Sequence, residues 1–277
     1  MQTSIAQVAA LTIYGNAFLL RRGTDVGFYP ANSTFQHCEY VNFVDLHKDG
    51  NNWVEAPFAG DPIAWFEKLR KQGIVTLRMQ YGPSGQTQPA DRLLVGFVGG
   101  GGRWLLEAQT SVFSDFWEAR WQVGDRTRQD QKIWRVTYAR FARNEPAIQA
   151  QGLEDLERLL QEFDKHLIAM EEFARSQKLD NFANLFQRAC SRLHSDPPYP
   201  DLYHSDLIRV EFLPVAACKL LAACQDAWVF GGMGSWNDQG FDAETQPRYE
   251  ALSEKLYQLL NRAIVMAANS SSYGTLT

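Results

Sequence analysis

Hydrophobic and polar positions follow two different periods along this 277-residue chain, and the change falls near residues 144–146. Before that point, apolar residues alternate with polar ones or form short runs, as they do in strands. After it, apolar residues recur every three or four positions, as they do on one face of a helix. The pattern predicts an α+β protein, with an antiparallel β-meander-rich N-terminal half followed by a helical C-terminal half of about four helices.

The β-prone segments of the first half are separated by clusters of Gly, Asn, Asp and Pro. Alternation is clearest around Trp117 and Trp121, where every second residue is charged or polar. Consecutive strands joined by short polar turns favour an antiparallel meander. The expected strands cover 11–20, 40–46, 74–81, the apolar run 93–98, a segment with Trp104, Leu106 and Ala108 after the glycine turn Gly99–Gly102, 117–123 and 133–141.

One helix is expected in the first half, at Pro62–Gln72, because Asp61 can cap it and proline fits the first turn. The helices expected in the second half cover about 150–176, 180–193, 208–226 and 246–269. The chain is therefore divided into a β-rich region, 1–145, and a helical region, 146–277. These regions are interpreted either as two domains or as two layers of a single domain.

Charge and composition narrow the function classes. Residues 1–145 carry a net charge of +2 and residues 146–277 carry -7, which disfavours binding to nucleic acid. No signal peptide or membrane-length apolar run is visible, so no membrane association and a cytoplasmic location are expected. The four cysteines form no CxxC pair, and neither a metal site nor a cofactor is predicted.

A glycine-rich segment, 230–238, is the first candidate site. Gly232 and Gly234 can leave backbone N–H groups free for an anion, while Ser235, Trp236, Asn237 and Asp238 could orient or stack on a ligand. No GxxxxGK[ST] motif occurs there. The alternative interpretation is a tight connection between two helices, with Trp236 as a buried anchor.

The segment 194–206 is the second candidate, because it gathers histidines, aspartates and serines. His204 and Asp206 are its candidate binding residues, since both types act as ligands and acid–base groups. A Ser–His–Asp triad is normally assembled from separate segments rather than from neighbours. The alternative is a proline-rich surface loop whose Ser205 or Asp206 caps the next helix.

No enzyme signature is present, so the leading hypothesis is a non-enzymatic protein-binding or accessory protein, of the immunity type found in bacteria. It rests on the acidic helical half and on the 13% of aromatic residues. One alternative is a hydrolase or small-ligand-binding protein whose site joins 231–238 to 194–206. Another is a structural subunit of a larger assembly, with a Trp-rich sheet face buried between copies.

Overall fold

Two units make up the chain, and each is assembled from segments far apart in the sequence. In the computed structural model, which describes residues 1–20, 27–85, 89–97, 100–147 and 155–272, the helical unit comprises Met1–Gln2, Tyr81–Arg103 and Gln151–Ser270. The sheet unit comprises Thr3–Gln80, Trp104–Ala150 and Ser271–Thr277. The protein is α+β, with most strands early and most helices late in the chain. The division into two domains at residue 145 stays a prediction.

The sheet unit contains one mixed six-stranded sheet, in the order β2-β1-β6-β5-β4-β3. Its strands are β1 (Cys38–Asp49), β2 (Asn52–Ala59), β3 (Thr76–Gly82), β4 (Arg103–Gln109), β5 (Phe113–Val123) and β6 (Trp134–Pro146). The predicted meander is confirmed for β4, β5 and β6, which pair antiparallel in succession. It does not extend to β1, which pairs parallel with β6, so the sheet is mixed rather than antiparallel throughout.

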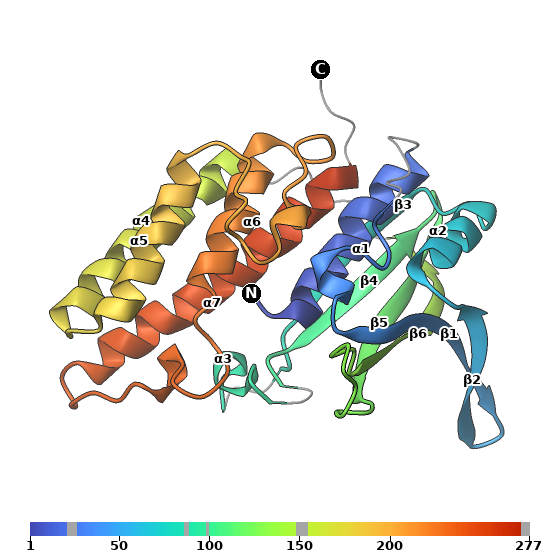
Figure 1. Cartoon of the computed structure of the whole chain (residues 1–277), viewed down its shortest axis with the longest axis horizontal. Coiled ribbons are helices and arrows are strands. Elements are labelled where there is room, and N and C mark those ends of the chain that lie inside the picture. Colours follow the sequence, from blue (N-terminus) through green and yellow to red (C-terminus); the bar gives the residue numbers. More distant parts are fainter. Residues whose placement is uncertain (21–26, 86–88, 98–99, 148–154, 273–277) are drawn as a thin grey trace. The chain divides into compact units, whose positions relative to one another are not determined.

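Two helices, α1 (Thr3–Leu19) and α2 (Pro62–Lys71), contribute to the core of the sheet unit (Figure 1). Trp65 of α2 stacks on Phe43 of β1 with ring centroids 4.4 Å apart, and it meets Trp117 of β5 edge-on at 5.6 Å. Tyr138 of β6 stacks on the same Phe43 and donates a hydrogen bond to Gln7 of α1. Trp117 therefore contributes to the core of its own unit, whereas Trp121 and Trp134 are only half-buried.

The expected strand at 11–20 is wrong, because residues 11–19 form the second half of α1. Gly15 lies so close to the sheet that an added Cβ would be 2.3 Å from Leu77 Cδ1. Asn16 accepts from the backbone N–H of Leu77 and donates to the Leu77 carbonyl, both at 2.8 Å. Tertiary contacts thus account for Gly15 and Asn16 in a helix, although both residue types have low helix propensity.

Two further differences concern short segments. The apolar run 93–98 was expected as a strand, but its described part belongs to the short helix α3 (Asp91–Leu94) and the turn after it. Val98 and Gly99 lie outside the described residues. Strand β2 was not predicted, because its residues around Trp53 and Val54 are largely exposed and show no buried alternation.

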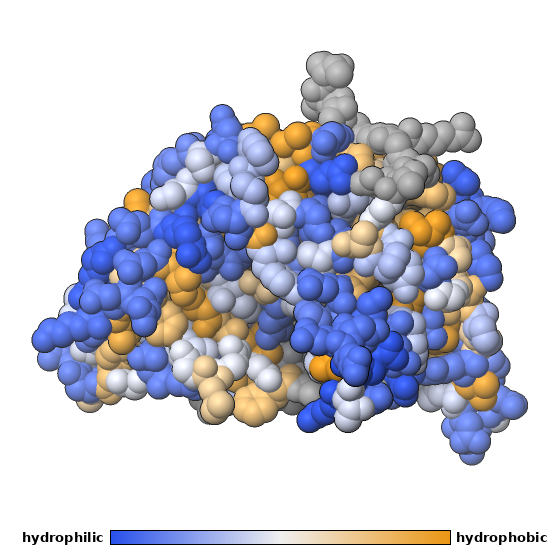
Figure 2. Space-filling view, viewed as in Figure 1, coloured by the Kyte–Doolittle hydropathy of each residue, from blue (hydrophilic) through white to orange (hydrophobic). Residues whose placement is uncertain are grey.

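The helical unit is built mainly from α4 (Leu156–Ser176), α5 (Asp180–His194), α6 (Val215–Ala227) and α7 (Gln246–Asn269). α5 packs against α4 and α6, and α7 packs against the same two helices (Figure 1). The surface over α5 is mostly hydrophilic (Figure 2), as its amphipathic pattern requires. Counting α1 and α3, the described residues hold seven α-helices rather than the five expected. Residues 150–154 of the helix expected at 150–176 lie outside the described residues. None of the described helices is long and apolar enough to cross a lipid bilayer.

Candidate functional site

The glycine-rich segment is anchored by Trp236, whose side chain is fully buried. The Trp236 indole donates a hydrogen bond to Ser253 of α7 at 2.7 Å, and the Tyr249 hydroxyl donates to the Trp236 carbonyl at 2.6 Å. Ser235 and Asp238 cap each other's backbone N–H groups around a short 3₁₀ turn. Gly232 and Gly234 both have positive φ, which favours glycine at these positions.

Asn237, in the same segment, contacts α3. Its Nδ2 donates to the carbonyl of Arg92 at 2.6 Å, and its Oδ1 accepts from Arg92 Nη1 at 3.3 Å. One amide thus binds both the backbone and the guanidinium of a single residue. The glycine-rich segment thereby fixes the position of Arg92.

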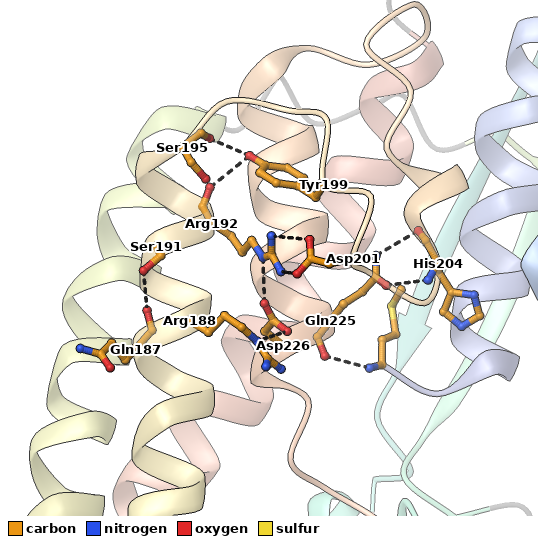
Figure 3. Close-up of polar contacts among 11 residues, drawn as sticks. Gln187, Arg188, Ser191, Arg192, Ser195, Tyr199, Asp201, His204, Gln225 and Asp226 are labelled. Carbon is orange, nitrogen blue, oxygen red and sulfur yellow. Dashed lines mark hydrogen bonds and ion pairs between the residues drawn. The ribbon is translucent and has the colours of Figure 1, made fainter.

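The second candidate segment, 194–206, is held on α5 and α6 by an ion-pair network (Figure 3). Arg192 of α5 binds both Asp226 of α6 and Asp201 of the segment, and Arg188 also binds Asp226. The Tyr199 hydroxyl donates to the backbone carbonyls of Arg192 and Ser195, at the end of α5. The acidic and basic side chains of this network pair with one another.

His204 is buried, and its backbone N–H and carbonyl both bind the side-chain amide of Gln225 (Figure 3). Burial lowers the pKa of His204 to about 4, so its imidazole is neutral at pH 7. Asp206 lies in the adjoining 3₁₀ helix, Ser205–Leu207. His204 is thus held by α6, whereas Asp238 is held by Ser235 of its own segment. That these residues bind a ligand or partner stays a prediction.

A cavity of about 870 Å³ lies elsewhere in the helical unit, between residues 81–83 and 90–92 on one side and α7 on the other. Tyr81, Asp91 and Arg92 line it from the first side, and Glu250, Glu254, Tyr257, Asn261 and Arg262 line it from α7. Its apolar lining comes from Pro83, Ala90, Val265 and Met266. The volume falls in the range typical of small-molecule sites. Neither of the two candidate segments lines it.

Three residues of this cavity carry buried polar atoms that make no hydrogen bond to any residue the structure describes. Asn261 is 3% exposed, and neither its Oδ1 nor its Nδ2 makes a hydrogen bond of ordinary length, although its amide lies close enough to the Tyr257 hydroxyl to act to lower the pKa of Tyr257. Oδ1 of Asp91 and Nε of Arg92 are also buried without a hydrogen bond. Arg92 Nε lies 3.6 Å from Glu254, which is an ion pair but too long for a hydrogen bond. Acceptors and donors are therefore both available in one place.

Burial and hydrogen bonds together set the protonation states around the cavity. Burial acts to raise the pKa of Asp91, but hydrogen bonds from Ser84 and Tyr81 outweigh it and hold that pKa below its ordinary value. Burial raises the pKa of Tyr81 and of Tyr257, so both hydroxyls stay protonated. The Tyr257 hydroxyl donates to the Gly101 carbonyl at 2.6 Å. At neutral pH the cavity thus presents an ionised Asp91 beside two neutral phenols.

The sequence reasoning missed this cavity and Asn261. A signal was present in α7, where Glu250, Glu254, Tyr257 and Asn261 recur at helical spacing beside the apolar stripe. The other wall comes mostly from a stretch, 82–91, whose Gly and Pro content predicts a loop; residues 86–88 of that stretch lie outside the described residues. Nothing local in the sequence indicates that Asp91 and Arg92 lie against a helix about 160 residues later.

Metal binding and cysteine chemistry find little support among the described residues. No group of three or more His, Cys, Asp or Glu side chains there could hold a metal ion. The four cysteines are free thiols, and burial raises the pKa of Cys38 to about 11 and of Cys218 to about 12. Such thiols are poor nucleophiles at pH 7. In comparisons with known proteins, no protein family, no curated protein and no solved structure matches this chain.

Proposed function

We propose that this protein binds a small polar molecule in the cavity that residues 81–83 and 90–92 form with α7. The observation that carries the proposal is Asn261, a buried amide that lines the cavity with neither polar atom hydrogen bonded. Leaving a buried polar group without a partner costs about 1–3 kcal/mol. A ligand with a donor and an acceptor would satisfy this amide, and it would reach Asp91 Oδ1 and Arg92 Nε as well.

The clustering of these atoms matters more than their existence. Trp65 and Trp117 in the sheet unit also have buried indole N–H groups without a hydrogen-bond partner. Each of those is a single donor on a ring packed against other aromatic rings. Around Asn261, in contrast, unsatisfied acceptors and donors on three residues border the same space. That arrangement is typical of a ligand site, where a few convergent polar groups fix orientation.

Ligand-observed NMR with a library of small polar molecules tests this proposal. The informative variant is Asn261→Leu, which keeps the approximate volume and removes the amide. The matched control is Asn184→Leu, since Asn184 is exposed on α5 of the same unit. Wild type and the control should bind the same compounds, and Asn261→Leu should bind them at least about tenfold more weakly. Compounds that bind all three proteins equally, or none of them, would contradict the proposal.

A second candidate function is the protein binding predicted from the sequence, and one surface feature favours it. Phe97 is 71% exposed and Met233 is fully exposed. They follow glycines whose backbones touch, because a Cβ added at Gly96 would lie 3.2 Å from Gly231 Cα. We name Phe97 and Met233 the apolar loop patch. Exposed apolar side chains that gather on one surface are a common mark of a docking site.

Native size-exclusion of cell lysate, with a double Phe97→Ser, Met233→Ser variant, tests this second candidate. Wild type should elute in a complex larger than the monomer, and the double variant should elute as the monomer. The control replaces two other exposed apolar residues of the helical unit, Ile168→Ser and Val210→Ser, and should keep the complex. A wild-type protein that elutes only as the monomer argues against this function.

A further inference from the structure

The charges around the cavity are unevenly paired. Each of its two arginines has a carboxylate partner: Arg92 pairs with Glu254 at 3.6 Å, and Arg262 pairs with Glu162 at 2.8 Å. Asp91 accepts hydrogen bonds from Tyr81 and Ser84, which are neutral groups, and Glu250 accepts one from Gln246. Two carboxylates of the lining therefore have no cationic partner among the residues that the structure describes.

The geometry of Asp91 shows which end of the cavity would receive a positive charge. Its Oδ2 is used by the Tyr81 hydroxyl and the Ser84 N–H, whereas its buried Oδ1 is unused. An N–H donor carried by a cation makes the strongest hydrogen bond to such an oxygen. The rings of Tyr81 and Tyr257, which meet edge-on at 6.2 Å, add aromatic surface of the kind that attracts cations.

Asn261 indicates a second chemical group that the ligand should carry. A buried primary amide with both atoms unused is complemented by another group that has one donor and one acceptor, such as an amide. It lies on α7 one turn beyond Tyr257, so the cationic and the amide-like ends of a ligand would be separated by the tyrosine pair. Val265 and Met266 give the connecting part an apolar wall.

We propose that the ligand carries a primary amine cation, bound by Asp91 with support from Glu250, and a second hydrogen-bonding group of the amide type, bound by Asn261. This inference rests on the proposed function, since it names the chemical class that the same cavity accepts. It predicts that the cavity binds a cationic ligand more tightly than neutral or anionic ligands of equal size.

Three six-carbon probes of matched length test the charge requirement. 6-Aminohexanamide carries the cation, 6-hydroxyhexanamide is its neutral counterpart, and the monoamide of adipic acid is the anion. Affinities are measured by NMR titration of the full chain, following the side-chain amide signals of Asn261. We expect the cation to bind at least about tenfold more tightly than either counterpart, with a preference that falls as salt is added.

Two variants locate the charge. Asp91→Asn should remove most of the preference for the cation, and Glu250→Gln should remove a smaller part. Glu250 is exposed, so the second variant folds even where the first does not. The control is Glu244→Gln, an exposed glutamate outside the cavity lining, which should leave the preference unchanged.

The possible failures are distinguishable. If the neutral or the anionic probe binds the cavity as tightly as the cation, the charge inference is overturned and small-molecule binding stands. If Glu250→Gln and Asp91→Asn both keep the full preference, the assignment of the charge to this site is overturned. If neither these probes nor any library compound shifts the Asn261 signals, the proposed function fails and the inference fails with it.

Discussion

Two buried asparagines, Asn16 in the sheet unit and Asn261 in the helical unit, show opposite uses of the same side chain. Asn16 is fully buried, and its amide bonds to the N–H and carbonyl of Leu77 and to the Ser271 hydroxyl. It thereby satisfies backbone groups of β3, a strand at the edge of the sheet. Asn261 is nearly as buried, but neither of its polar atoms makes a hydrogen bond of ordinary length. A buried amide that is hydrogen bonded within the fold contributes to stability. A buried amide that lacks such hydrogen bonds can instead bind a ligand.

The largest expected effect comes from breaking a satisfied polar cluster in the sheet unit. Arg140 is buried and binds Asp45 through two nitrogens and Asp115 through a third. Arg140→Ala leaves both carboxylates without this partner, so the free energy of unfolding should fall by about 3–5 kcal/mol. Urea unfolding followed by circular dichroism measures it. Arg120→Ala, which breaks an exposed pair with Glu55, should cost less than about 1 kcal/mol; equal costs would refute this account.

Asn16→Leu should lower the free energy of unfolding by about 2–4 kcal/mol, because it strands the Leu77 N–H and carbonyl without their partners. The same urea measurement applies. A second variant, Asn16→Asp, keeps the acceptor for the Leu77 N–H and loses the donor to its carbonyl. A loss below about 1 kcal/mol for Asn16→Leu would mean that this asparagine does not stabilise the edge strand.

His204 provides a titratable counterpart in the helical unit. Its pKa is about 4 in the folded chain because of burial, against about 6.5 when exposed in the unfolded chain. Between these values the unfolded chain binds more protons, so the free energy of unfolding should fall by about 2 kcal/mol as the pH drops from 6.5 to 4. His204→Gln should flatten this part of the pH profile. A variant whose profile parallels wild type would contradict the assignment.

The smallest effect has the opposite sign. Asn261→Leu replaces an unsatisfied buried amide with an apolar side chain of similar size, so without ligand it should raise the free energy of unfolding by about 1 kcal/mol. Thermal and urea unfolding of the variant and of Asn184→Leu check this. Asn16→Leu and Asn261→Leu are the same substitution with opposite expected signs. A clear loss of stability in Asn261→Leu would show that Asn261 is structural.

Local sequence patterns predicted the helices and strands whose buried residues recur with the regular helical or strand spacing. α2, with its Asp61 cap, and α7, with its apolar stripe, agree with the expectation within a residue or two. The second half of α1 was misread because Gly15 and Asn16 are shaped by contacts with Leu77, 61 residues from Asn16. The parallel pairing of β1 with β6 also lies beyond a local pattern.

The candidate site shows the same limit. Clustered glycines drew attention to Gly232, and a gathering of histidines, aspartates and serines drew attention to His204. In the structure, Trp236 anchors the first loop and Gln225 binds the second. Asn261 sits inside a regular helix and breaks no local rule. Its distinction is an absence of hydrogen bonds, which depends on what the tertiary fold brings near it. The only signal in the sequence was the helical spacing of polar residues along α7, which indicates a polar face that could line a site.

The parallel pairing of β1 with β6 has a consequence for synthesis of the chain. Asp45 and its partner Arg140 are 95 residues apart, and they are joined across the strands by the buried ion pair. At about 5–20 residues per second, the ribosome makes Arg140 roughly 5–20 s after Asp45. For that interval the β1–β2 hairpin has an open edge where β6 will later bind, and a hairpin alone is marginally stable. The sheet unit therefore completes its fold only after most of its chain has emerged.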